Sequence, residues 1–114
     1  MRDDRVHLRH VLECIAAIRE FTSGGYDAFI SDRKTNKAVL RELHELAESA
    51  RRLSPGLKGE HPEIPWSAIA GFRNVIVHDY LGLNTQRIWS IVQRDLVPLE
   101  TAVRSMLSRL ESGT

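Results

Sequence analysis

The chain has 114 residues, of which 42% are hydrophobic and 27% are charged. This composition is ordinary for a folded globular protein and excludes disordered and fibrous classes. The formal net charge of +1 excludes a strongly basic nucleic-acid coat, but it leaves room for a local basic patch. We expect residues 1–114 to form one domain, small enough that oligomerisation would add useful burial.

No apolar run approaches the roughly 18 residues that a membrane-spanning helix needs. The first residues lead directly into an amphipathic pattern and do not resemble a signal peptide, so we expect a soluble, cytoplasmic protein without membrane contact. Cys14 is the only cysteine, which excludes an intrachain disulfide. Its apolar neighbours indicate a small buried side chain.

The first predicted helix covers residues 4–21, because apolar residues recur there every three or four positions. Asp3 or Asp4 can cap its start, and the glycine pair at 24–25 ends it. His7 and His10, with Glu13, have a spacing that resembles a metal site. We interpret them as a solvated helix face, because two histidines and one surface carboxylate are weak evidence for a metal.

Residues 26–30 indicate a short helical turn, and Asp32 can cap a long helix that runs to about Leu53. The charged flank of this helix has the spacing of a solvated face with weak ion pairs. His44 and Glu48, four residues apart, are interpreted as structural support. The apolar stripe of the helix consists of Val39, Leu43, Leu46, Ala47, Ala50 and Leu53.

The composition of residues 54–59 predicts a loop, which continues through two prolines as far as Trp66. We expect Trp66 to fill a gap in the core. A helix should carry Ala68 to about Tyr80 and end at Gly82.

Asn84 can cap the last helix, which Pro98 should kink near Asp95 or divide into two helices. Its apolar positions are Ile88, Val92, Leu96, Leu99, Val103, Met106 and Leu110. No segment alternates with the period of a strand. The predicted fold is an all-α, up-and-down bundle of four to five helices.

Residues 73–80 hold the cluster of polar groups best suited to phosphate chemistry. At 100° per residue, Ile69, Phe72 and Ile76 share a sector that should face the core. The opposite sector carries a guanidinium, an amide and an imidazole, a suitable set for an anion. Val77 lies among them, which suggests a subunit interface. From spacing alone, a solvated helix face explains the cluster equally well. The residues of the polar sector are Arg73, Asn74, Val77 and His78.

Three phrases together resemble the HepT toxins of the HEPN superfamily: HPEIPW at residues 61–66, Gly-x-Arg-Asn at 71–74, and Arg-x4-His-x-Tyr at 73–80. The first helix, residues 38–54 and the late segments at 88–89 and 95–99 also resemble that family, so the likeness covers nearly the whole chain. One departure is Ala47-Glu48-Ser49, where the family usually has Gly-Glu-Ala. It affects the expected helix packing more than the expected activity.

The resemblance implies a HEPN-like homodimer that acts as a metal-independent endoribonuclease, without a cofactor, and is the toxin of a type VII-like toxin–antitoxin pair. Two copies of the motif would face a shared cleft that binds tRNA or mRNA. His78 would then act as general acid or base, Arg73 would hold the scissile phosphate, and Asn74 would orient His78 or the phosphate. Glu48 is a candidate for support of the same site.

The resemblance also implies that the antitoxin is a minimal nucleotidyltransferase that transfers AMP to Tyr80. An attached phosphate would place negative charge beside Arg73 and His78 and block RNA. Two alternatives stay open. The chain could be a non-catalytic HEPN dimerisation or nucleotide/RNA-binding module, or a metal-dependent hydrolase, which a chelator test would distinguish. The hydrolase would use His7, His10, Glu13 or His61.

Overall fold

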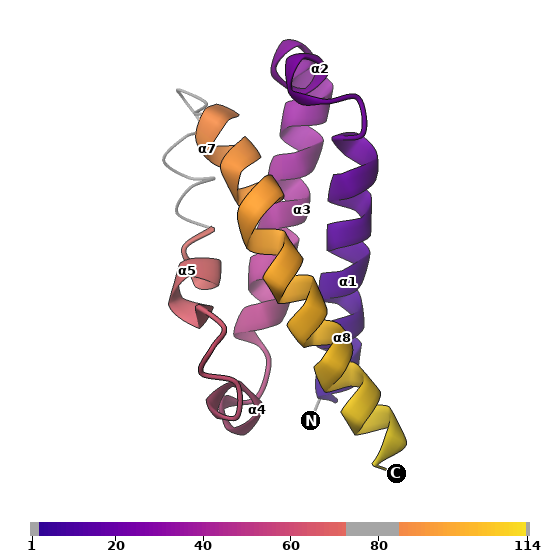
Figure 1. Ribbon diagram of the computed structural model, residues 1–114, viewed down its shortest axis with the longest axis vertical. Coiled ribbons are helices and arrows are strands. Elements are labelled where there is room, and N and C mark those ends of the chain that lie inside the picture. The colour runs from indigo at the N-terminus through magenta and orange to yellow at the C-terminus, as the bar shows by residue number, and fades with distance from the viewer. Residues whose placement is uncertain (1–2, 73–84, 114) are drawn as a thin grey trace.

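The computed structural model describes residues 3–72 and 85–113, and this part of the chain forms helices without strands. The predicted all-α fold is therefore confirmed. In Figure 1 the chain rises through α1, descends through α3, and descends again through α8, which crosses the lower half of α1. The elements are α1 (Asp4–Phe21), α2 (Tyr26–Ser31), α3 (Arg33–Arg51), α4 (Pro55–Gly59), α5 (Trp66–Ala70), α7 (Thr85–Ser90), the π-helical segment η1 (Ile91–Asp95) and α8 (Leu96–Ser112).

The core is built from the apolar stripes that the sequence predicts on α1, α3 and α8. Each stripe repeats every three or four residues, so each helix buries one face and leaves the other in water. Cys14 is 1% exposed, as expected from its neighbours. Among the described helices, none has the length and apolar character required to cross a bilayer. The largest fully buried side chains include Leu8, Ile15, Ile18, Phe29, Leu43, Leu46, Ile88, Leu96 and Met106.

Asp3 and Asp4, at the start of α1, have different roles. Asp3 is the N-cap, because its Oδ1 accepts a hydrogen bond from the Arg5 amide at 2.9 Å. Asp4 instead accepts from the Ser54 amide at 2.9 Å and from the Ser54 hydroxyl at 2.7 Å. Asp4 therefore joins the start of α1 to the start of α4, which lies 50 residues later.

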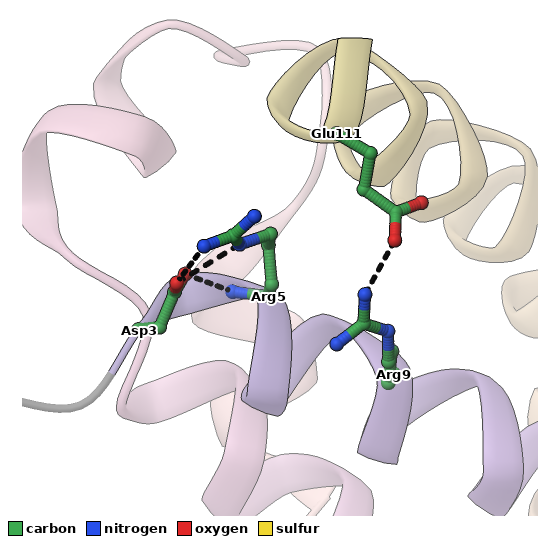
Figure 2. Close-up of polar contacts among 4 residues, drawn as sticks. All are labelled: Asp3, Arg5, Arg9 and Glu111. Carbon is green, nitrogen blue, oxygen red and sulfur yellow. Dashed lines mark hydrogen bonds and ion pairs between the residues drawn. The ribbon is translucent and has the colours of Figure 1, made fainter. Parts of the chain in front are cut away.

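Surface ion pairs accompany the packing of α1 against α8. Arg9 pairs with Glu111 near the C-terminus of α8, as Figure 2 shows, and Arg19 pairs with Glu100 at 2.5 Å. Because all but Glu100 are about half exposed, these pairs contribute little to stability beside the buried apolar contact. Their spacing along both helices fits the antiparallel course of α1 and α8 in Figure 1.

We predict that Asp3→Asn reduces the acid sensitivity of folding. Hydrogen bonds from the Arg5 side chain and amide hold the pKa of Asp3 at about 2, below its usual 3.8 (Figure 2). A carboxyl with a lowered folded pKa stabilises the protein above the unfolded pKa, and this contribution is lost as pH falls through about 2. Asparagine keeps the cap without the charge.

Urea unfolding from neutral pH down to about pH 3 measures this effect. The difference in unfolding free energy between wild type and Asp3→Asn should narrow as the pH falls. Asp27→Asn, at an exposed aspartate in the first turn of α2, is the matched control. A difference that stays constant over the whole range would contradict the prediction.

Buried polar and aromatic contacts hold α2 against its neighbours. Asn36 on α3 is 5% exposed and donates to the carbonyl oxygens of Phe29 at 2.5 Å and Asp32 at 2.8 Å. Asp32 also caps α3 by accepting from the Lys34 amide, as predicted. The Phe29 ring lies 5.5 Å from the ring of Trp89, which orders α7 beside α2.

The loop predicted at residues 54–59 is wrong, because Pro55–Gly59 form the short helix α4. Ser54 is its N-cap and accepts from the Leu57 amide, while Pro55 occupies the first turn, where its missing amide costs nothing. Leu57 is buried, which gives the helix an apolar anchor. The two glycines indicated a loop, but a cap, an N-terminal proline and one buried leucine outweigh them.

The predicted helix from Ala68 to Tyr80 is also not continuous. Helix α5 ends at Ala70, and Gly71 forms a turn whose amide donates to the Ser67 carbonyl at 3.0 Å. Ala68, the expected first residue of that helix, is exposed. The proposed helix end at Gly82 and the Asn84 cap lie outside the described residues.

The interruption predicted near Asp95 is confirmed as a π-helical segment, η1. The Leu96 amide donates to the carbonyl of Ile91, five residues back, in place of the usual four. Pro98 follows closely and has no amide for the carbonyl of Arg94. The wider π turn lets α7 and α8 continue as one bent rod with Ile91, Val92 and Leu96 facing the core.

Candidate functional site

The residues predicted to carry the chemistry are Arg73, Asn74, His78 and Tyr80, and they lie outside the described residues, as does Val77. The structure describes the chain that enters this segment at Phe72 and the chain that leaves it at Thr85. The described parts of the chain that come before and after this segment are the loop at residues 61–65 and helix α5 on one side, and α7, η1 and α8 on the other.

Buried side chains lie before and after the undescribed segment that contains the motif. Ile69 is 3% exposed and Phe72, directly before Arg73, is 4% exposed, so this part of the predicted core sector is confirmed. On the far side, Ile88 is fully buried. Ile76, the third residue of the predicted core sector, lies outside the described residues.

The motif HPEIPW at residues 61–66 contains a buried histidine, His61, that joins the loop to α8. Arg109 Nη2 lies 2.8 Å from His61 Nε2, and His61 Nδ1 lies 3.1 Å from Glu63 Oε2. A guanidinium offers only donors, so Nε2 must accept and Nδ1 must carry the proton that it donates to Glu63. His61 is thus a neutral bridge between two charged side chains and is not arranged as a metal ligand.

Glu63 and Trp66 make further hydrogen bonds that hold the loop at residues 61–65 in place. A hydrogen bond from its own backbone amide and one from His61 hold the pKa of Glu63 below its usual range. The indole Nε1 of Trp66 donates to the carbonyls of Lys58 and His61, both at 3.1 Å. Trp66 is half-buried against the core, as predicted. These hydrogen bonds therefore fix the position of the loop that precedes α5.

We predict that Arg109→Ala loosens residues 61–66 without unfolding the bundle. The change leaves the buried His61 Nε2 without its donor, which typically costs about 1–3 kcal/mol. Amide hydrogen exchange in the loop should accelerate by the factor that corresponds to this loss of free energy. The amides of α1 and α3 should keep their protection. Arg104→Ala, which removes an exposed arginine paired with Glu100 on the same helix, is the control. Equal loop protection in both variants would show that the bridge contributes nothing.

A small cavity lies between the loop, α5, η1 and α8. Its volume is about 140 Å³, and its mainly apolar lining includes the acidic residues Glu63 and Asp95. Ligand pockets usually have about 300 Å³ or more, so this cavity is too small for a nucleotide. It is lined by Glu63, Ile64, Pro65, Ala68, Ile69, Phe72, Asp95, Pro98, Leu99 and Ala102.

Glu48 lies in a different place, in an open groove of about 560 Å³ that α1 and α3 form together. It is half-buried, and its Oε2 lies 3.2 Å from Arg51 Nη2. Its position relative to Arg73 and His78 falls outside the described residues. The groove is lined by Val6, His7, His10, His44, Glu45, Glu48, Ser49 and Arg52.

The prediction that His7 and His10 form a solvated face is wrong. His7 is 5% exposed, and His10 is half-buried with its Nδ1 at 2.5 Å from the Ser49 hydroxyl. Both turn toward α3, because the packing of α1 against α3 extends to the edge of the apolar stripe. Glu13 is exposed and is not part of this contact.

A cluster of possible metal ligands that the sequence did not predict lies where His10 and Glu45 line the groove. The ligand atoms of His10, Cys14 and Glu45 all lie within 4.8 Å of one another. Burial, followed by the nearby carboxylates of Glu42 and Glu45, raises the pKa of Cys14 to about 12. The available signal was the four-residue spacing of His10 and Cys14, which places both on one helix face. Glu45 joins them only through the packing of α3.

Comparison with known proteins places the chain in a family. Residues 11–106 match the family described as "Ribonuclease HepT-like". A protein of Thermococcus cleftensis named "Probable ribonuclease HepT" is 33% identical over 100 residues, which cover 87% of this chain and 91% of the relative. No solved structure matches the chain significantly.

Two further relatives have names that refer to the same activity. "Putative RNase MJ0127" of Methanocaldococcus jannaschii is 36% identical over 80% of this chain and 76% of its own length. "Putative RNase TTE0752" of Caldanaerobacter subterraneus is 29% identical over 96% of this chain and 98% of its own length. Since the family match also spans most of the chain and contains the Arg-x4-His-x-Tyr phrase, this protein belongs to the HepT-like ribonuclease family.

Proposed function

We propose that the chain is a metal-independent endoribonuclease that works as a homodimer and is the toxin of a toxin–antitoxin pair. The observation that carries this proposal is the family match over residues 11–106, because it includes every residue of the motif. The three relatives described above, whose names call them RNases, support an RNA substrate.

The proposed reaction is attack of a ribose 2′-oxygen on the adjacent phosphorus. His78 of one subunit removes the 2′-hydroxyl proton, and the P–O5′ bond breaks as the new P–O2′ bond forms. The leaving 5′-oxygen takes its proton from a general acid, for which His78 of the second subunit is available. The products are a 2′,3′-cyclic phosphate and a free 5′-hydroxyl, and no metal takes part.

Arg73 and Asn74 have supporting roles in this proposal. The Arg73 guanidinium offers paired donors to the non-bridging phosphate oxygens, which gain negative charge in the transition state. Asn74 orients His78 or the phosphate through its amide. A two-fold axis would supply two copies of each group, and Val77 would lie in the contact between subunits.

Regulation is proposed to act on Tyr80, seven residues after Arg73. Transfer of AMP from a minimal nucleotidyltransferase antitoxin to the tyrosine hydroxyl would place a phosphate beside Arg73 and His78. The added negative charge and the bulk of the nucleotide would exclude the RNA backbone from the site. Tyr80→Phe should therefore keep ribonuclease activity and become insensitive to the antitoxin with ATP.

The deciding experiment is an RNA cleavage assay with EDTA, after intact mass has shown that Tyr80 carries no AMP. Cleavage that persists with EDTA and leaves 2′,3′-cyclic phosphate ends is the expected result. Linear phosphate ends, or a requirement for a metal that takes part in the reaction itself, would overturn the mechanism. Unmodified dimers that bind RNA without cutting it would favour the non-catalytic binding module.

A further inference from the structure

We propose that His10, Cys14 and Glu45 bind a thiophilic divalent metal ion, with Zn²⁺ as the best fit, that joins α1 to α3. Two donors come from α1 and one comes from α3, and their ligand atoms lie within 4.8 Å of one another. Imidazole nitrogen, thiolate sulfur and carboxylate oxygen are all ligands that zinc accepts. The proposal is independent of the ribonuclease reaction and gives the ion a structural role.

The distance between the two donors on α1 suits a single ion. His10 Nε2 lies 3.8 Å from Cys14 Sγ. Zinc bonds of about 2.3 Å to sulfur and 2.0–2.1 Å to nitrogen place two ligands roughly 3.6 Å apart at a tetrahedral angle. The observed distance therefore needs an adjustment of only a few tenths of an ångström. The spacing i,i+4 holds both side chains over the same face of the helix.

The second nitrogen of His10 is already held in the orientation that a zinc ligand needs. Nδ1 lies 2.5 Å from the hydroxyl oxygen of Ser49 on α3. A partner on one ring nitrogen fixes the tautomer and turns the other nitrogen toward the metal. Here the serine holds Nδ1, and Nε2 faces Cys14.

The charges and access of the cluster also fit a cation. One carboxylate and one thiolate would neutralise a divalent ion, and the thiol proton would leave to solvent when the metal binds. Cys14 is 1% exposed, but His10 and Glu45 line the open groove between α1 and α3. An ion can therefore enter from the groove and meet His10 and Glu45, whose ligand atoms lie within 4.8 Å of the Cys14 sulfur. Water entering by the same groove can supply a fourth ligand.

The test is a Co²⁺ titration of the full chain without a histidine tag, under reducing conditions. Because Cys14 is the only cysteine, a sulfur-to-cobalt charge-transfer band reports on this site alone. We expect the band to saturate at one Co²⁺ per chain and to disappear when Zn²⁺ is added. Cys14→Ala should abolish it, and Glu45→Gln should weaken Co²⁺ binding at least about 10-fold.

His44→Gln is the matched control, because His44 is an exposed groove residue outside the cluster. It should leave the titration unchanged. Circular dichroism verifies that each variant is folded, and Zn²⁺ should raise the Tm of wild type but not that of Cys14→Ala. No charge-transfer band in the folded wild type, or a band that survives Cys14→Ala, would overturn the proposal.

Discussion

Replacing His78 with alanine should lower the rate of RNA cleavage by about 10²- to 10⁴-fold, the usual contribution of a general acid or base. The loss should appear in kcat, since the imidazole acts on protons that move during the reaction, whereas RNA binding depends mainly on phosphate contacts. The rate is measured on a labelled RNA with unmodified protein, at fixed salt and in the presence of EDTA.

His44→Ala is the control for this experiment, because His44 is an exposed histidine on α3 that the proposed reaction does not use. Arg73→Ala should impair both RNA binding and cleavage, since a guanidinium contacts the phosphate before and during reaction. A His78→Ala protein that cleaves at the wild-type rate would remove the proposed mechanism and leave Arg73 as part of a binding surface.

Mixed dimers would test whether the two motifs act together. If the acid and base are His78 side chains of two subunits, then wild-type subunits paired with His78→Ala subunits should be much less than half as active as wild-type homodimers. Subunits with independent sites would retain half of the activity. The comparison distinguishes one composite site from two separate sites, which sequence patterns cannot do.

The proposed metal cluster changes how a chelator test should be interpreted. Loss of cleavage with EDTA would ordinarily indicate a catalytic metal. If His10, Cys14 and Glu45 hold a structural ion, EDTA could reduce activity by loosening α1 from α3. Cys14→Ala separates these cases, because a variant without the site should cleave equally with and without EDTA.

Most of the described fold could be predicted, because its helices follow from sequence patterns that span only neighbouring residues. The apolar stripes of α1, α3 and α8 repeat with the period of a helix, and Asp32 and Pro98 mark a helix start and an interruption. The error at Pro55–Gly59 arose because glycine content was given more weight than the Ser54 cap. The continuity expected across Gly71 failed because periodicity indicates which residues face the core, but it does not indicate where a turn divides the helix.

Contacts between distant helices were not predictable in the same way. No spacing rule connects His61 to Arg109, which lies 48 residues later, or Cys14 to Glu45 on another helix. Both contacts depend on how helices pack together. Proximity in sequence grouped His10 with Glu13, whereas the partners of His10 are Cys14 on the same helix face and Ser49 on α3.

Phe72→Ala should cause the largest loss of stability among single changes near the motif, about 3–5 kcal/mol. Phe72 is 4% exposed and borders the cavity of about 140 Å³, so removing its ring would enlarge an existing void. Phe21→Ala is the matched control, because Phe21 is 40% exposed. It should change the unfolding free energy by only about 0.5 kcal/mol.

Urea unfolding at equal protein concentrations gives the comparison, since any dimerisation makes stability depend on concentration. Similar losses in the two variants would mean that Phe72 does not anchor the core. Phe72 also directly precedes Arg73, so its removal should slow RNA cleavage under conditions where the variant is still folded. A folded Phe72→Ala protein with full activity would show that the motif holds its geometry without this anchor, and that contacts beyond Phe72 position Arg73.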